Sequence, residues 1–351
     1  MSDNTEATRL LGIDACRGAA VTAVLLFLAT RQLNWAFGVP FLLRAFQFGH
    51  AGADVFFVIS GFIVLYVHYE HIGTPARLIG FVWRRLTRLM PTYWAALGIT
   101  AMQNKLAGHS FPSPRSLVWS ASLLAPKSEL LLGIAWTLRY QAVFYAMFCM
   151  LILSRTAGVL LLALWLVGIV MSMLAGSVIA GVPDLVFGSY NLQFFFGMAA
   201  AYVMRSHRVP APMTVLTIGI VLFAIAAIAE DIGMLDGYAD PARLAYGLPA
   251  ALIVLGLAEA GRRSQVIVPP QLIVLGKASY SIYLFQLVFI GIVSQLMLVS
   301  GLHRWMPELF TFPLMVATAM AGGILVSRWF EFPLMRLLRG QELRVAPRAV
   351  V

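Results

Sequence analysis

The chain has 351 residues, of which 60% are apolar and only 11% are charged, and its mean hydropathy is +0.85. Soluble domains usually carry about a quarter charged residues, so this composition excludes a water-soluble fold and indicates that the chain lies mostly in a lipid bilayer. The net charge of +10 does not indicate nucleic-acid binding, because there is no soluble basic domain to hold it and because the cytoplasmic loops of membrane proteins accumulate Lys and Arg.

Apolar stretches recur along the chain, and most are long enough to cross a hydrocarbon core of about 30 Å at 1.5 Å per residue. We therefore expect an all-α, polytopic integral membrane protein with about ten transmembrane helices. The third and sixth stretches are the shortest. In chain order, the expected helices are residues 13–30, 51–67, 91–104, 132–153, 157–176, 190–204, 211–229, 243–259, 279–300 and 309–330.

The pattern along the chain predicts one membrane domain, with no internal repeat and no linker. This domain covers residues 13–338, between a tail of residues 1–12 and a tail of residues 339–351. With a cytoplasmic N-terminus, the inside segments hold 15 Lys and Arg residues and the outside loops hold seven. Since positive residues gather on the cytoplasmic side, we predict that both tails are cytoplasmic and that the loop of residues 231–243 is outside.

The first apolar stretch does not look like a cleaved signal peptide, and the two cysteines do not indicate a metal site. Asp14 and Arg17 lie inside the first stretch, and no small-residue cleavage site follows it, so we expect a retained helix rather than a secretory signal. Cys16 and Cys149 both fall in expected helices, which favours buried thiols over a disulfide framework. We expect no metal site.

Ionisable residues inside a membrane usually face the helix bundle or a water-filled cavity. Asp14 and Arg17 are three residues apart, so they share a helix face and can neutralise one another. His50 and Asp54 are four apart and can likewise meet at the outer end of the second helix. This pair is either an orienting dyad for general base chemistry or a loop histidine that caps a helix.

A cationic segment lies between the second and third expected helices. Arg84, Arg85 and Arg88 are spaced to form one helical face, and we expect this segment to be a loop that ends at Pro91, a helix-breaking residue. Guanidinium groups suit phosphate oxygens. The alternative is that these arginines contact anionic lipid headgroups or set the topology.

Taken together, these segments resemble the membrane-bound acyltransferase 3 family, the exopolysaccharide type of sugar O-acyltransferase. Residues 13–18 are similar to its opening motif, residues 52–62 to its second-helix signature and residues 84–93 to its arginine-rich segment. Trp136 to Leu138 with Phe144 and Tyr145, the late Ser-Tyr-Ser-x-Tyr segment at residues 276–284, and the closing Glu-x-Pro at residues 331–334 complete the resemblance in order, over about residues 10–340.

The resemblance implies a ten-helix acyltransferase in the bacterial cytoplasmic membrane. It implies acyl-CoA, most often acetyl-CoA, as the donor substrate and no permanently bound cofactor. The acceptor is a hydroxyl of a glycan or lipid-linked saccharide, membrane lipids are further partners, and the oligomeric state stays open. The residues expected to bind donor or substrate are Arg84, Arg85, Arg88, Tyr93, Trp136, Gln141, Tyr145, Ser279, Tyr280, Tyr283 and Gln286, and the expected catalytic residues are His50, Asp54 and Arg17.

Several positions depart from the family pattern. The resemblance expects a catalytic histidine eleven residues after Arg17, where this chain has Leu28, which cannot accept a proton. Gln141 and Gln193 stand where glutamates are usual, and Gln286 stands where a histidine is usual. Glutamine keeps hydrogen-bonding capacity but does not exchange protons near neutral pH.

Three explanations of this pattern stay open. Either the chemistry has moved to His50 and Asp54, or the chain is a non-catalytic relative, or the sequence has been altered. The corresponding functions are an O-acyltransferase that works by direct transfer and a catalytically silent membrane protein that binds coenzyme A or a glycan during polysaccharide assembly or export. A transporter is a third class, which the missing repeat disfavours.

Overall fold

The computed structural model describes residues 2–108, 110–175 and 184–345, and all regular structure in this part of the chain is helical. The expectation of an all-α fold is confirmed. The α-helices are α1 (Ser2–Phe37), α2 (Gly52–His68), α3 (Leu78–Leu106), α4 (Pro114–Ala121), α5 (Trp136–Leu153), α6 (Arg155–Leu174), α7 (Asp184–Phe187), α8 (Leu192–Ser206), α9 (Pro212–Asp231), α10 (Asp240–Arg262), α11 (Pro270–Ser300), α12 (Glu308–Val326) and α13 (Phe332–Val345).

Eight helical segments within the described residues are long and apolar enough to cross a membrane. They include α1, α2, α5, α6, α9, α10, α11 and the joined segment of α12 and α13. The third and sixth expected stretches correspond to α3 and α8, which do not meet these criteria. The chain is thus a polytopic membrane protein, while the expected number of ten spanning helices is not confirmed.

The arginine-rich segment was expected to be a loop, and this prediction is wrong. Residues 84–93 lie within α3, which begins at Leu78 and continues through Pro91. A proline removes one main-chain hydrogen bond, but neighbouring helices and Thr side chains can compensate within a helical bundle. Thr87 lies one turn before the proline, and its hydroxyl donates to the main-chain oxygen of Trp83 at 2.8 Å.

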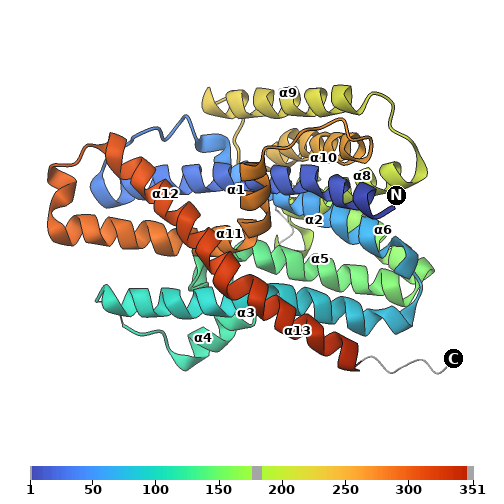
Figure 1. Cartoon of the computed structure of the whole chain (residues 1–351), viewed down its shortest axis with the longest axis horizontal. Helices are drawn as coiled ribbons and strands as arrows, with labels where there is room; N and C mark the ends of the chain where they lie inside the picture. The colour runs from blue at the N-terminus through green and yellow to red at the C-terminus, as the bar shows by residue number, and fades with distance from the viewer. Residues whose placement is uncertain (1, 109, 176–183, 346–351) are drawn as a thin grey trace.

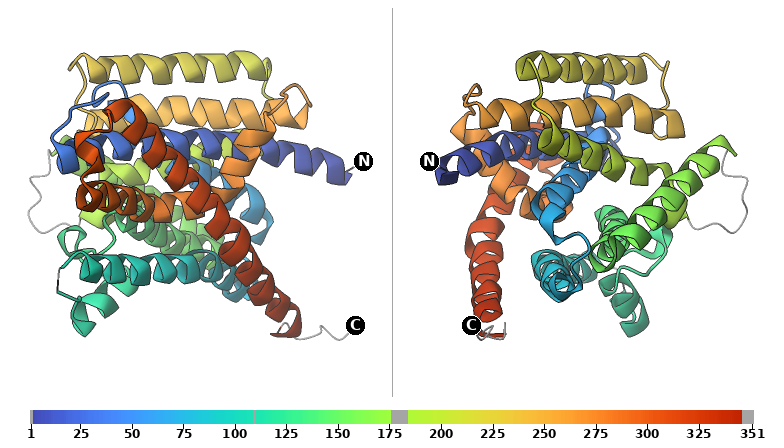
Figure 2. Two further views of the ribbon diagram at one scale, coloured as in Figure 1. Left: turned by 60° about the vertical axis from the view of Figure 1, so that its left-hand side comes forward. Right: turned by 90° about the vertical axis from the view of Figure 1, so that its right-hand side faces the viewer.

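The long helices run roughly side by side in one bundle (Figure 1). Helix α9 forms an outer layer that packs on α10, and α10 packs in turn against α1 and α8 (Figure 2). The other extensive pairs are α1 with α11, α2 with α8 and α11 with α12. The segment from α12 into α13 crosses the bundle obliquely, with a short π-helical stretch, η8 (Ser327–Glu331), between the two helices.

Glycines allow the two closest helix pairs to form. A Cβ added at Gly276 of α11 would overlap the main-chain oxygen of Asp14 on α1, and one at Gly197 of α8 would overlap the main-chain oxygen of Val58 on α2. Small residues let backbones approach in this way where van der Waals packing, rather than water exclusion, drives helix association.

Helices α1 and α11 pack extensively against each other and meet at two levels. Asp14 meets Gly276 near one end, and Gln32 donates to the hydroxyl of Ser294 near the other end at 3.3 Å, a sequence separation of 262 residues. A Cβ added at Gly18 of α1 would overlap the main-chain oxygen of Leu272 on α11. The two helices are therefore in contact near residues 14–18 of α1 and again near Gln32.

The helix termini lie at two opposite sides of the bundle. The start of α1 and the end of α13 lie on the right-hand side of Figure 1, while the ends of α1, α9 and α11 lie on the left. We name these the inner and outer ends, following the predicted orientation. The start of α1 and the end of α13 therefore lie on one side of the bundle, and the loop between α9 and α10 lies on the other.

Candidate functional site

A cavity of about 90 Å³ lies between α1, α2, α3, α5 and α11. It gathers eight residues that the sequence predicted for the site, and these come from four different helices. They are Arg17, Arg85, Arg88, Gln141, Tyr145, Ser279, Tyr280 and Tyr283. We call this space the arginine cavity. Segments far apart in the chain thus meet around one space, as the resemblance implied.

The positive charge of the arginine cavity has little compensation from acidic side chains. Arg17 lies 4.0 Å from Asp14, at the limit of an ion pair. Neither Arg85 nor Arg88 forms an ion pair with a carboxylate in the described part of the chain. The Arg85 guanidinium lies over the rings of Phe81 and Tyr145, 5.3 and 5.4 Å from their centres. Ring contacts therefore hold Arg85, and both Arg85 and Arg88 are available to an anion.

Gln141 belongs to a hydrogen-bonded group on the cavity wall. Its amide nitrogen donates to the hydroxyl of Ser60 at 2.9 Å and to that of Tyr145 at 2.8 Å. A neutral amide supplies two donors, whereas an ionised glutamate supplies none. The glutamine is therefore integrated in the wall as a donor, and it positions Ser60 and Tyr145 rather than exchanging protons.

Two buried polar atoms of the cavity-lining residues have no hydrogen-bond partner among the described residues. They are Oγ of Ser279 and Nε of Arg85. A buried polar atom without a partner costs free energy, and such atoms in a cavity wall indicate where a polar ligand or water binds. Thr137 and Tyr283, in contrast, satisfy one another through a hydroxyl contact of 3.0 Å.

The remaining predicted binding residues do not line the arginine cavity. Arg84 lies beside Gly80 on its own helix, and Tyr93 is fully buried, where it donates to the main-chain oxygen of Ser120 at 2.6 Å. Trp136 packs against Tyr190, with ring centres 4.9 Å apart. The prediction that the three arginines share one face therefore holds for Arg85 and Arg88 at the cavity wall, while Arg84 is turned away from it.

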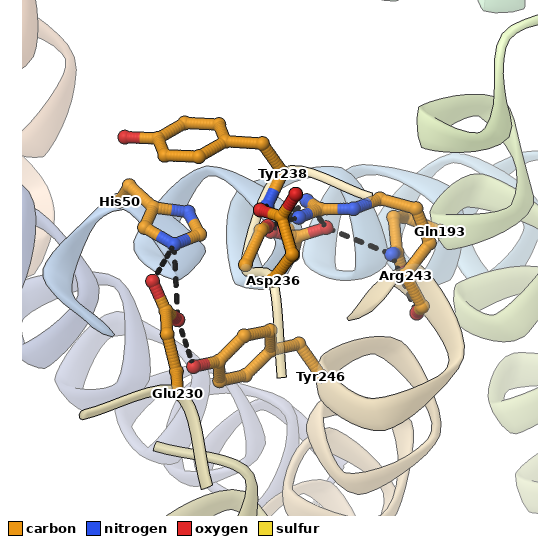
Figure 3. A network of polar contacts seen from close by, with 9 residues as sticks. His50, Gln193, Glu230, Asp236, Tyr238, Arg243 and Tyr246 are labelled. Carbon is orange, nitrogen blue, oxygen red and sulfur yellow. Dashed lines mark hydrogen bonds and ion pairs between the residues drawn. The ribbon is translucent and has the colours of Figure 1, made fainter. Parts of the chain in front are cut away.

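A second polar group occupies the outer end of the bundle (Figure 3). His50 lies on the 3-10 helix η1 (Gln47–Ala51), and its Nε2 is 2.8 and 3.1 Å from the two carboxylate oxygens of Glu230, at the end of α9. The hydroxyl of Tyr246 donates to the same carboxylate at 2.5 Å. The ring of Tyr238 stacks on His50 with centres 4.6 Å apart. We call these four residues the outer dyad and its supports.

Asp54 belongs to a separate, fully buried ion pair. Arg243 donates through Nη1 to both carboxylate oxygens of Asp54 at 2.6 Å, and both side chains are completely shielded from solvent. The amide of Gln193 also donates to Asp54, at 2.8 Å. Arg243 further donates to the main-chain oxygen of Gly237 in the outer loop. In the described structure His50 therefore bonds to Glu230, and no hydrogen bond joins it to Asp54.

Two further departures from the family pattern, Leu28 on α1 and Gln286 on α11, do not line the arginine cavity. Leu28 packs in the apolar clusters on both sides of it. Gln286 is fully buried, and neither of its amide atoms has a partner within the described residues.

The sequence analysis did not assign a role to Glu230, Arg243, Tyr246 or Glu331. Glu230 and Arg243 each lie more than 100 residues from their partners in the chain. Glu331 was noted within the closing motif, and it accepts a hydrogen bond from the hydroxyl of Ser281 at 2.6 Å. Its position in a π-helical stretch, a feature frequent at functional sites, was not visible in the hydropathy pattern.

The fold and the cavity define a polytopic helical membrane protein with a cationic site between its helices. The acyltransferase domain of the acyltransferase 3 family matches residues 10–328, so the chain belongs to this family. The exopolysaccharide production protein ExoZ of Rhizobium meliloti (strain 1021) is 32% identical over 325 residues, which cover 86% of this chain and 93% of that relative. No solved structure matches the chain.

Proposed function

We propose that this chain is a membrane O-acyltransferase that moves an acyl group, in the simplest case acetyl, from cytoplasmic acyl-CoA to a hydroxyl of a glycan or lipid-linked saccharide. The membrane is the bacterial cytoplasmic membrane, with both tails in the cytoplasm. Membership of the acyltransferase 3 family and the similarity to an exopolysaccharide production protein support an acyltransferase of polysaccharides. The donor, the acyl group and the residue roles are the further content of the proposal.

The observation that carries the proposal is the arginine cavity. Arg85 and Arg88 face it without a carboxylate partner within 4 Å in the described chain. Removing cations from water is costly unless an anion compensates them. Guanidinium groups bind phosphate oxygens with two parallel hydrogen bonds, so the phosphates of coenzyme A are the matching ligand at this end.

The other cavity-lining groups suit the thioester end of the donor. Beyond the arginines the walls carry Ser60, Thr137 and Tyr283 among apolar side chains such as Phe56 and Phe57. A narrow space with a few hydroxyls orients a small acyl group while excluding most water. Orientation of this kind supplies much of the acceleration in a direct transfer between two bound substrates.

A second candidate function, that of a non-catalytic binding protein, is supported by three residues. Leu28, Gln141 and Gln286 occupy positions where the family resemblance expects proton-transfer groups. The alternative is a catalytically silent protein that binds coenzyme A or a glycan. It shares the arginine cavity with the first proposal and differs from it only in the absence of acyl transfer.

Donor binding is tested with purified protein in detergent. We expect Arg85→Gln with Arg88→Gln to weaken coenzyme A binding by roughly 3–6 kcal/mol, because two charge-assisted contacts worth about 1.5–3 kcal/mol each are lost. The matched control is Arg155→Gln with Arg208→Gln, which removes the same charge from two exposed arginines outside the cavity. Equal coenzyme A affinity of both double variants would mean that Arg85 and Arg88 set the topology and do not bind the donor.

Transfer itself is tested by acetate incorporation into membrane glycans, compared between cells with and without the gene. Incorporation that depends on the gene, and falls with the Arg85 and Arg88 substitutions, is the expected result. Coenzyme A binding without any gene-dependent incorporation would favour the silent binding protein.

A further inference from the structure

We propose that His50 is the general base for the acceptor hydroxyl, that Glu230 and Tyr246 are its positioning residues, and that the acceptor reaches them from the outer end. This inference rests on the proposed acyltransferase function and adds to it the site at which the glycan hydroxyl is activated. It replaces Asp54, the expected partner of His50, with Glu230.

The contacts of His50 determine which ring nitrogen is available. Nε2 faces both oxygens of Glu230, at 2.8 and 3.1 Å. A carboxylate accepts hydrogen bonds, so the neutral imidazole carries its proton on Nε2 and leaves Nδ1 as an acceptor. No described residue forms a hydrogen bond with Nδ1. The ring is thus held in the tautomer that a base requires, with its free nitrogen unused by the protein.

The supports of the dyad restrict its motion. Tyr246 donates to Oε2 of Glu230, Tyr238 stacks on one face of the imidazole, and Phe27 contacts the ring edge-on with centres 5.8 Å apart. The side chains of His50 and Glu230 are only 7% and 3% exposed. A base oriented by a second group, which is itself held by a third, is the arrangement expected of proton-transfer sites.

Asp54 is not available for this role. Its two oxygens are occupied by Arg243 and Gln193, and the pair is completely shielded. Asp54 instead fixes α2 to α8 and α10 just below the dyad. The charged groups that interact with His50 are Glu230 and Asp54. Arg31, Asp236 and Arg243 lie near Tyr238, the ring that stacks on His50.

The dyad is connected to the arginine cavity through the start of α2. Ala53 lines the cavity and follows His50 by three residues, whereas His50 and Glu230 do not themselves line it. For transfer, the acyl group must therefore extend past Ala53 to reach an acceptor hydroxyl beside His50.

The transfer step is balanced without a further reactant. Nδ1 of His50 takes the proton of the acceptor hydroxyl while the hydroxyl oxygen forms a bond to the thioester carbonyl carbon. The carbon–sulfur bond then breaks, and the leaving thiolate takes a proton from the imidazolium. The products are the acylated glycan and coenzyme A with a free thiol.

The test compares single variants in an acyl-transfer assay with saturating and limiting acyl-CoA. We expect His50→Gln to lower kcat by about 10²–10⁴-fold without changing the KM for acyl-CoA, because the donor is bound elsewhere. The control is His303→Gln, another histidine of the outer end, which bonds to the main-chain oxygen of Met297 and stacks on Phe37. This variant is expected to retain full activity.

A double-mutant cycle separates positioning from general stability. If Glu230 acts through His50, then Glu230→Gln lowers kcat in the unmodified chain and has no further effect in the His50→Gln background. Tyr246→Phe keeps the ring and removes one hydrogen bond, so it provides a folded variant with a smaller loss of kcat.

Three outcomes overturn the assignment. An active chain in which His50→Gln has normal kcat removes the base role of His50 while leaving the acyltransferase function intact. Additive losses from His50→Gln and Glu230→Gln make Glu230 a structural residue. An unmodified chain that binds coenzyme A and transfers no acyl group overturns the proposed function, and the dyad with it.

Discussion

The buried charges of the outer end differ from those of the arginine cavity. At the outer end Arg243 bonds to Asp54 and His50 bonds to Glu230. The inner end also has a paired site, where the buried Glu259 binds Arg262 and Arg263, but Arg85 and Arg88 face the arginine cavity without a carboxylate partner among the described residues. A paired charge holds the protein together, whereas an unpaired one is available to a ligand.

This difference in pairing indicates that the two ends have different roles. Under the proposed function, Arg85 and Arg88 receive the anionic part of the donor, and they gain their partners only when it binds. The outer end is complete without a ligand, and its hydrogen bonds preorganise the imidazole of His50. Substitutions at the inner end should therefore change affinity, and substitutions at the outer end should change either stability or the rate of the chemical step.

The largest expected effect is a difference in cysteine labelling between the two ends, which face opposite sides of the membrane. In a chain with Cys16 and Cys149 replaced by alanine, Asp236→Cys should react with an impermeant maleimide in intact cells, and Ser2→Cys should react only after permeabilisation. This follows from the excess of Lys and Arg in the inner segments. Labelling of both cysteines from the same side would defeat the assignment of inner and outer ends.

The next effect concerns the buried pair of the outer end. We expect Arg243→Gln to lower the free energy of unfolding by about 3–5 kcal/mol, because it leaves the charge of Asp54 buried and uncompensated. Unfolding in mixed micelles with increasing denaturing detergent measures this change. The control is Arg304→Gln, which alters an exposed arginine of the outer end. Similar unfolding of the two variants would show that the pair is not structural.

The smallest effect concerns Gln286, whose buried amide has no described partner. Gln286→Leu should raise the free energy of unfolding by about 1–3 kcal/mol, since an unsatisfied polar group is replaced by an apolar one of similar size. Gln103→Leu is the matched control, because the Gln103 amide donates to the main-chain oxygen of Val288 at 3.3 Å. A less stable Gln286→Leu variant would mean that the amide is satisfied in the membrane by water or another group.

Much of the fold followed from local sequence properties. Each long apolar stretch corresponds to a helix, and the three-residue spacing of Arg85 and Arg88 places both on the cavity wall, because helical periodicity is a short-range property. Pro91 misled the prediction, since the effect of a proline depends on its neighbours in the bundle. The arginine-rich segment is therefore part of α3 rather than a loop.

The outer site could be predicted only in part. His50 was identified from its spacing to Asp54, but its partner Glu230 lies 180 residues away in the chain, and the partner of Asp54 lies 189 residues away. Such pairs depend on how α2, α9 and α10 pack, which hydropathy does not encode. The cavity-lining hydroxyls of Ser60 and Thr137 escaped notice for the same reason.

The close packing of α1 and α11 has a mechanical consequence. Backbone contact at Gly276 and the polar contact between Gln32 and Ser294 prevent these two helices from sliding past each other without losing both. The pair should therefore move as one rigid unit in any motion of the bundle.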